Sequence, residues 1–367
     1  MTHRPPRVRP RAPRTRLEVC DFTAARPNLA NGAERANDKT HRHMNTNTQE
    51  PPTLNIWTNG LDGPEIEYPD AQIDKRENLS RKEFLNEYVL KNRPVVIKDA
   101  AKHWKALSKW SPDFFREKYG SKKVPVFERK RAVTVKDMVL LKDYADEITS
   151  STYQNRAKYL FSLKIPKEFP ELLGDLEPRP TYWDPNWLES KYLLPGLPKF
   201  KLRNITGLEM NMGGAGSPFP FLHYDDLWTQ TFITQVYGRK AWVLYQPDQT
   251  PFMYPSEQSD NISRIPMEKD VDLTEFPLFA KAKPLRFILE EGEMLYGAPG
   301  WWHTTLALTP SIAVVLSTAN GTIWSAVTKA SFLRALQNPK WYVRPLAFPV
   351  SAYMTAFRAV KSMTDPF

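Results

Sequence analysis

Two histidines and one aspartate are the residues of this sequence best placed for metal chemistry. His223 and Asp225 stand two positions apart in the segment FLHYDDLW. Because residues i and i+2 of an extended strand point to the same face, their side chains would converge, while Tyr224 and Asp226 would point away. His303 follows 78 residues after Asp225, directly after a turn rich in proline and glycine. In a rolled-up sheet, strands this far apart can face each other, so His303 is the third candidate.

Two imidazoles and one carboxylate on one side of an ion form the facial triad of non-haem Fe(II) oxygenases. Three protein ligands leave three coordination positions open, two for a bidentate 2-oxo acid and one for O₂. The same residue types could hold Zn²⁺, which normally keeps a single open position for water. A histidine two residues before an aspartate is common by chance, and a lone strand histidine is more often a core residue. The spacing alone therefore leaves iron, zinc and core packing open.

The elements needed to position these residues are mostly short strands between residues 158 and 320. The candidates are Tyr159–Leu163, Leu208–Met212, Thr229–Tyr237, Ala241–Tyr245, Leu285–Leu289, Met294–Tyr296 and Ser311–Ser317. Turns rich in glycine and proline separate them. Many short strands with such turns predict a sandwich or barrel, and the jelly roll is one of the common solutions. We therefore expect a mainly β fold with flanking helices and a double-stranded β-helix (jelly-roll) core.

The first helix expected is Leu79–Lys91. Ser80 and Glu83 are three residues apart at its start, which is the spacing of a capping box. The apolar face of this helix would consist of Phe84, Tyr88 and Leu90.

A second helix is predicted at Trp110–Tyr119, with Ser111 as its cap. Short strands are predicted at Arg93–Lys98 and Val124–Glu128. These elements form an entry region, residues 51–157, ahead of the barrel.

The chain returns to helix in residues 321–367. Apolar residues recur near helical spacing in Trp324–Gln337. A second helix, Ser351–Met363, places Tyr353, Phe357, Val360 and Met363 along one stripe. Such a stripe is usually core, and a homodimer contact through these helices is the alternative.

Residues 1–50 have the composition of a tail that does not fold. They carry ten Lys/Arg and five Asp/Glu, so half of the net charge of +10 lies there. Prolines among the arginines of residues 4–16 oppose the amphipathic helix of a mitochondrial presequence, and the apolar segment of a secretory signal is lacking. We expect a disordered, solvated tail. The alternatives are a nuclear or nucleic-acid-binding segment and a true start at Met44.

The overall composition is that of a globular chain, with 41% hydrophobic and 25% charged residues. Its apolar runs are strand-sized and too short for a membrane span. Cys20 is the single cysteine, so an internal disulfide is impossible, which fits a reducing compartment. The charge outside the tail is only +5, which does not predict nucleic-acid binding. We expect an intracellular protein, cytoplasmic or nuclear, without membrane contact.

A series of motifs carries a family resemblance. They are RPVVIKDAAKHW at 93–104, KWSPDFFREKYG at 109–120, KYLFSLKIP at 158–166, FPELLGD at 169–175, LHYDDLW at 222–228, QVYGRKAWVLYQP at 235–247 and EEGEMLYGAPGWWH at 290–303. In this order they resemble the JmjC-type, cupin-fold oxygenases, especially the small hydroxylases related to the asparaginyl hydroxylase that inhibits hypoxia-inducible factor. The resemblance covers about residues 75–320.

The resemblance implies roles for five residues. His223, Asp225 and His303 match the iron ligands. Lys240, 17 residues after the first histidine, matches the lysine that binds the distal carboxylate of 2-oxoglutarate. Tyr159 matches a tyrosine that often hydrogen-bonds the same carboxylate. The implied cofactors are Fe(II), 2-oxoglutarate as co-substrate and O₂; the alternatives are a solvated hairpin lysine and a tyrosine that only packs in the core.

Two positions depart from the family pattern. Pro220 stands three residues before the first histidine, where the family often has a Thr or Ser that contacts the co-substrate. Thr229 stands where a related branch has Asn. These changes leave the three metal-ligand candidates in place and concern co-substrate and substrate binding.

Members of this family hydroxylate protein side chains, and one branch hydroxylates a modified tRNA base. Others demethylate histone lysines through an unstable hydroxymethyl group and commonly carry reader or zinc modules, which this sequence lacks. The resemblance therefore implies hydroxylation of a protein side chain. The rival interpretations are a cupin-fold binding or scaffold protein without turnover, and a hydroxylase of a modified RNA base.

Overall fold

In the computed structural model, the chain divides into two units, residues 1–49 and 50–367. The structure describes residues 52–57, 68, 73–130, 133–193, 207–257, 259–338 and 340–364. The tail expected at residues 1–50 lies outside these described residues. Everything below concerns the second unit.

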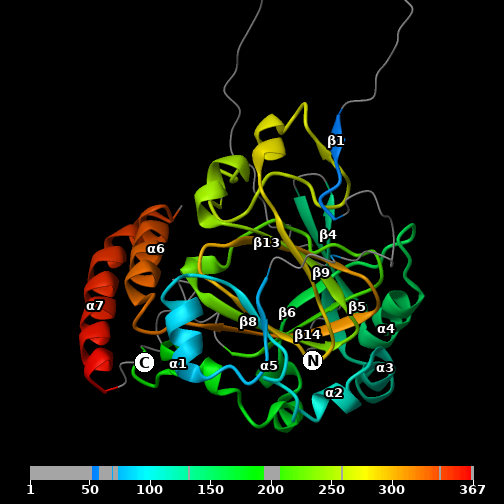
Figure 1. The fold of residues 1–367 in the computed structure, drawn as a ribbon, viewed down its shortest axis with the longest axis horizontal. Helices are drawn as coiled ribbons and strands as arrows, with labels where there is room; N and C mark the ends of the chain where they lie inside the picture. Colours follow the sequence, from blue (N-terminus) through cyan, green and yellow to red (C-terminus); the bar gives the residue numbers. More distant parts are fainter. Residues whose placement is uncertain are drawn as a thin grey trace, which may run out of the picture. The chain divides into compact units, whose positions relative to one another are not determined.

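Short strands build the core of this unit (Figure 1). They are β1 (Thr53–Leu54), β2 (Lys75–Arg76), β3 (Val95–Ile97), β4 (Lys123–Lys130), β5 (Val133–Leu140), β6 (Leu160–Lys164), β7 (Glu209–Gly213), β8 (Gln230–Tyr237), β9 (Lys240–Tyr245), β10 (Val271–Asp272), β11 (Leu285–Leu289), β12 (Met294–Gly297), β13 (Trp302–Ala307) and β14 (Ser311–Thr318). The larger sheet has the order β2-β3-β12-β8-β14-β7-β6, and the smaller one the order β11-β9-β13. Successive strands alternate between the two sheets, as β8 to β9 and β12 to β13 do, so the expected jelly-roll core is confirmed.

The turn between β8 and β9 carries the chain from the larger sheet to the smaller one. Gly238 has a φ of +70°, and a Cβ there would lie 2.1 Å from the carbonyl oxygen of Pro310. Only glycine fits such a position, because it has no Cβ to clash. The turn makes Lys240 the first residue of β9, where it pairs with Leu289 of β11 and Ala307 of β13.

The strands predicted between residues 158 and 320 each correspond to an observed strand, with ends that differ by one residue at most. Val124–Glu128 lies within β4, and Arg93–Lys98 contains β3. β5 and β13 were not predicted. β13 follows the Pro-Gly turn directly and was interpreted only as the position of His303.

The first helix differs from its prediction. It begins at α1 (Arg81–Phe84), and Ser80 Oγ accepts from the Glu83 N–H at 3.2 Å, so the predicted cap is confirmed. The capping box is wrong, because the Glu83 carboxylate accepts instead from the Arg76 guanidinium at 2.5 Å. The chain continues as a π-helix over Leu85–Val89, which leaves Leu90 beyond the helix and 60% exposed.

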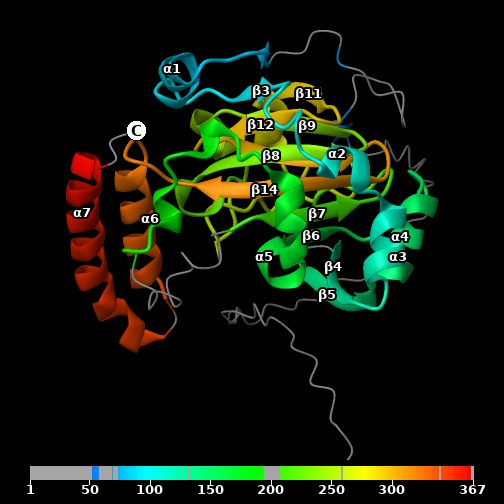
Figure 2. The ribbon, with the colours of Figure 1, turned by 90° about the horizontal axis from the view of Figure 1, so that it is seen from below.

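The helices lie around the strand core (Figures 1 and 2). They are α1, α2 (Ala106–Lys109), α3 (Pro112–Tyr119), α4 (Leu141–Ser150), α5 (Ile165–Glu168), α6 (Trp324–Leu336) and α7 (Ala347–Thr364). The predicted Ser111 cap of α3 is confirmed, since its Oγ accepts from Phe114 N–H at 3.1 Å. In both views α6 and α7 lie side by side at one edge of the core, opposite α3 and α4.

The stripe predicted along the last helix is only partly core. Phe357 is 6% exposed, but Val360 and Met363 are 56% and 77% exposed. The helix is rotated so that Met354 and Phe357 face the aromatic cluster beneath α6. Among the described residues, no helix combines the length and apolarity that a membrane crossing requires. The homodimer contact stays a prediction.

Candidate metal centre

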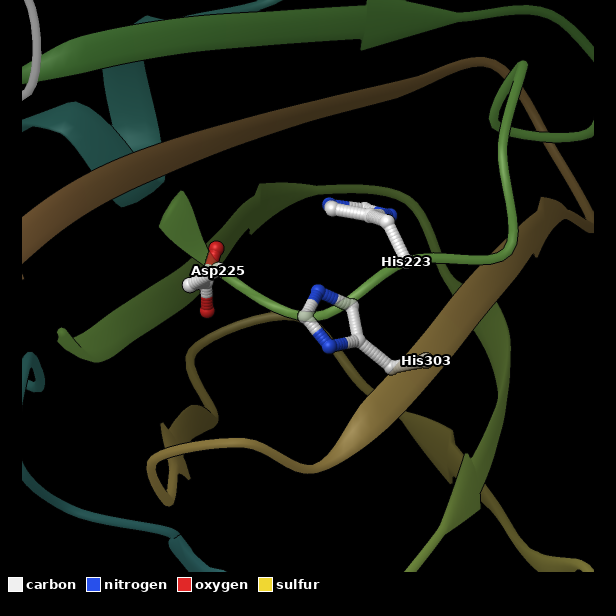
Figure 3. A group of neighbouring side chains, drawn as sticks. All are labelled: His223, Asp225 and His303. Carbon is white, nitrogen blue, oxygen red and sulfur yellow. The ribbon is translucent and has the colours of Figure 1, made fainter. Parts of the chain in front are cut away.

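His223, Asp225 and His303 come together in the folded chain (Figure 3). One donor atom from each side chain lies within 4.8 Å of the others. All three residues border a cavity of about 250 Å³ between the two sheets. Two ligands of one ion, each about 2.1 Å from it, are at most about 4.2 Å apart. Small side-chain movements therefore suffice to let the three donors share an ion.

The backbones of the two histidines pair directly with each other. The His223 N–H donates to the His303 carbonyl at 3.0 Å, and the His303 N–H donates to the His223 carbonyl at 2.6 Å. Side chains directly opposite each other in an antiparallel pair lie on the same face. This pairing explains why the two imidazole rings lie with their centroids 4.4 Å apart.

The segment that holds Asp225 is not the regular strand that the sequence analysis assumed. His223 forms isolated bridges, and a 3₁₀ turn, η8 (Asp226–Trp228), begins directly after Asp225. Asp225 is nevertheless extended, with φ −61° and ψ 140°. Asp225 joins the two histidines, whereas the carboxylate of Asp226 forms an ion pair with Arg334 of α6.

Both imidazoles are oriented by backbone carbonyl groups. His223 Nδ1 lies 3.3 Å from the carbonyl oxygen of Phe221, and His303 Nδ1 lies 3.0 Å from that of Trp301. Because a carbonyl oxygen can only accept, each Nδ1 carries the proton and each Nε2 keeps its lone pair for a metal. Burial, and secondarily the neighbouring His303, lower the pKa of His223 well below its ordinary value. A neutral imidazole is the form that ligates a metal.

Lys240 and Tyr159 line the same cavity. Lys240 is 2% exposed, and its ammonium donates to the Tyr159 hydroxyl at 2.8 Å. Within the part of the chain that the structure describes, no carboxylate forms an ion pair with Lys240. Lys240 is therefore not the solvated hairpin lysine of the alternative interpretation. It is a buried cation that faces a cavity, and burying a charge without a counter-charge is unfavourable.

The sequence model of a family described as "Cupin-like domain" matches residues 80–316, which include both histidines, Asp225 and Lys240. The chain belongs to the JmjC/cupin-like family. Its recognised members include a "Lysine-specific demethylase JMJ30" of Arabidopsis thaliana, 30% identical over 246 residues, which are 66% of this chain and 54% of the relative.

Two further relatives of this cupin-like protein differ in what their names say. "Lysine-specific demethylase 8" of Xenopus tropicalis is 28% identical over 67% of this chain and 52% of the relative. "tRNA wybutosine-synthesizing protein 5" of Gallus gallus is 26% identical over 66% of this chain and 75% of the relative. The chain spans about half the length of the two demethylases.

The cavity of the cupin-like protein also contains residues that the sequence analysis missed. The hydroxyl groups of Thr231, Thr304 and Thr305 are buried and lack a hydrogen-bond partner among the described residues. Phe219 stacks on His223, with ring centroids 4.8 Å apart and planes 18° apart. The available signal was position, because Thr304 and Thr305 directly follow His303.

The two departures from the family pattern have clear places in the structure. Thr229 does not border the cavity, since its Oγ1 donates to the Asp226 carbonyl at 3.0 Å and supports the turn after Asp225. Pro220 offers no hydroxyl, but the three threonines supply hydroxyl groups to the same cavity. The loss of a hydroxyl at position 220 therefore does not leave the cavity without uncharged donors.

Proposed function

We propose that this protein is an Fe(II)- and 2-oxoglutarate-dependent oxygenase that hydroxylates a protein side chain. His223, Asp225 and His303 would hold the metal, and Lys240 with Tyr159 would hold the distal carboxylate of 2-oxoglutarate. The observation that carries this proposal is Lys240, a buried ammonium without a carboxylate partner among the described residues, in the same cavity as the three donors.

The residues fit the metal and the co-substrate chemically. Two neutral imidazoles and one carboxylate suit Fe(II), and three ligands leave room for a bidentate 2-oxo acid and O₂. A dicarboxylate would supply the counter-charge that Lys240 lacks, because a carboxylate and an ammonium form a charge-assisted hydrogen bond. The Tyr159 hydroxyl would donate to the same carboxylate, while its oxygen accepts from Lys240.

The bound metal, with 2-oxoglutarate and O₂, supplies the oxidation: one oxygen atom enters a substrate C–H bond as a hydroxyl, and 2-oxoglutarate becomes succinate and CO₂. The protein contributes orientation and a dry site. The carbonyls of Phe221 and Trp301 fix the two imidazoles. Phe161, Phe219 and Phe221 pack edge to face or tilted beside the donors, which limits the access of water.

A modified RNA base is a second candidate substrate. The relative named for tRNA wybutosine synthesis is matched over 75% of its own length, more than the two demethylases are. The substrate also decides the outcome of the reaction. Hydroxylation at an ordinary carbon leaves a stable alcohol, whereas hydroxylation of an N-methyl group releases formaldehyde.

The test measures conversion of 2-oxoglutarate to succinate by the purified full-length chain with Fe(II). We expect turnover even without substrate, and none in His223→Ala. His103→Ala is the matched control, because His103 is exposed and lies outside the cavity. Fe(II) and 2-oxoglutarate binding without succinate formation, under any substrate mixture, would favour the scaffold interpretation.

Substrate class is tested by offering peptide and tRNA mixtures to the active protein. A mass increase of one oxygen atom on a peptide supports the proposal. The same increase on RNA moves it to the second candidate, and formaldehyde release with loss of a methyl group identifies a demethylase.

A further inference from the structure

The backbone directly after Asp225 has an unfavourable conformation. Leu227 and Trp228, in the turn η8, have φ values of +58° and +59°. Residues other than glycine rarely adopt this left-handed conformation, because Cβ then approaches the following carbonyl group. Two such residues in succession persist only where the surrounding structure holds them. The position of Asp225 therefore depends on what anchors this turn.

The side chain of Leu227 anchors the turn to the C-terminal helices. Leu227 is 1% exposed and belongs to a cluster with Trp324 and Val327 of α6 and Met354 and Phe357 of α7. α6 and α7 therefore form part of the wall against which the turn packs. Residues far along the chain thus support the segment that carries the Asp225 carboxylate.

Trp228 anchors the turn to the segment before His303. A Cβ on Gly300 would lie 2.6 Å from the Trp228 ring, so the ring lies directly against this glycine. Gly300 itself has a φ of +75°. The turn after one candidate ligand therefore touches the turn before another.

Arg334 of α6 adds polar contacts to this arrangement. Its guanidinium forms an ion pair with Asp226, the neighbour of Asp225 on one side. It also donates to Asn261 Oδ1 at 3.1 Å. Asn261 in turn donates from Nδ2 to the carbonyl of Tyr224, the neighbour on the other side, at 2.9 Å, and Tyr224 N–H donates to the Asn261 carbonyl at 3.1 Å.

One planar guanidinium therefore connects α6 to both neighbours of Asp225. Arginine suits this task, because its N–H groups form a rigid fork that can serve two acceptors at fixed angles. Asp226 and Asn261 also border the cavity. Arg334 itself is outside the set of residues around the cavity, so it acts through them.

We propose that Arg334 is a positioning residue for the metal ligand Asp225, and that the C-terminal helices thereby set the affinity of the metal site. The inference rests on the proposed function, because it takes His223, Asp225 and His303 as the ligands. The competing interpretation is that Arg334 only attaches α6 to the core. That role would affect stability alone.

The experiment titrates the metal-free full-length protein with Co(II), follows the d–d absorption of the bound ion, and measures thermal unfolding of the metal-free protein separately. Arg334→Gln should weaken Co(II) binding about 10- to 100-fold, the range seen when a group that orients a ligand is lost. Asp226→Asn should weaken it similarly. The double variant should be no worse than either single one, because both remove the same contact.

Two further variants sharpen the result. Arg334→Lys should restore the affinity only in part, since one ammonium replaces a fork that reaches two acceptors. Lys329→Gln is the matched control, because Lys329 is an exposed cation on the same helix; its Co(II) affinity should equal that of the unaltered protein.

Arg334→Gln and Asp226→Asn variants that unfold at lower temperature but bind Co(II) with unchanged affinity and spectrum would overturn the positioning role and leave the proposed function standing. If the unaltered protein and His223→Ala bind Co(II) equally, the metal site itself is wrong, and both proposals fall. Asp226→Asn guards against loss of folding in Arg334→Gln, because it removes the same ion pair by exchanging two atoms of similar size.

Discussion

Lys240 and Asp225 line the same cavity, but their backbones are held in different ways. Lys240 is the first residue of β9, which is paired on both sides by β11 and β13. Asp225 lies in an irregular segment and is followed by two residues in left-handed conformation. The backbone ladder holds the first residue, whereas side-chain contacts with Arg334 and Leu227 hold the second. Remote changes should therefore disturb Asp225 more readily than Lys240.

The largest effect on this comparison should come from removing a ligand that a backbone bridge holds. His223→Ala leaves the bridge to His303 intact but deletes an imidazole donor. We expect metal affinity to fall more than about 100-fold, beyond the range for groups that only orient a ligand. Metal content after dialysis and Co(II) titration measure this, with His103→Ala as the control that should bind normally. Equal metal content in both variants would remove His223 from the site.

Lys240→Ala should change co-substrate binding and leave metal binding intact. A charge-assisted contact contributes about 1.5–3 kcal/mol, which corresponds to a roughly 10- to 150-fold rise in the 2-oxoglutarate binding constant. Lys240→Arg should rescue poorly, because a planar guanidinium needs more room inside the barrel.

The matched control for Lys240 is Lys281→Ala, since Lys281 is exposed and lies away from the cavity. Calorimetric titration of 2-oxoglutarate into the metal-loaded variants decides the question. An unchanged constant in Lys240→Ala would assign the buried ammonium a purely structural role.

Gly300→Ala tests the contact between the two turns that flank the ligands. Gly300 and Gly292 both have positive φ values, +75° and +85°, but a Cβ on Gly292 would meet nothing closer than 3.9 Å. Gly292→Ala should lower the free energy of unfolding by about 1–2 kcal/mol through backbone strain alone. Gly300→Ala should cost more, because the Trp228 ring has to move, and should also weaken Co(II) binding.

Denaturant unfolding and Co(II) titration of the two glycine variants separate these terms. Equal losses of stability with unchanged metal affinity would show that the contact of Trp228 with Gly300 does not support the site.

The smallest effect should come from removing residues 1–43. Every residue that borders the cavity lies between Tyr159 and Ser317. A chain that begins at Met44 should therefore keep its unfolding temperature, its Co(II) affinity and its succinate formation. Loss of any of these in the shortened chain would contradict the prediction that this tail is dispensable. A salt-dependent RNA affinity that disappears with the tail would instead assign it to nucleic-acid binding.

The sequence by itself determined the features that depend on local order. Strand periods and Gly/Pro turns located the barrel strands to within a residue. The two-residue spacing singled out Asp225 over Asp226, and the motif order indicated the family that the comparison confirmed. These features are readable because a pleated backbone and a tight turn act over a few residues.

Only the tertiary structure decided how distant residues meet. The sequence did not show that Arg334 pairs with Asp226, that Glu83 turns to Arg76, or that Lys240 is buried without a carboxylate partner among the described residues. Nor did helical periodicity decide which side of α7 packs inward, since Val360 and Met363 are as apolar as Phe357 yet lie exposed. The physical reason is that burial and ion pairing depend on which elements the fold brings together, and the residues concerned are up to about a hundred positions apart in the chain.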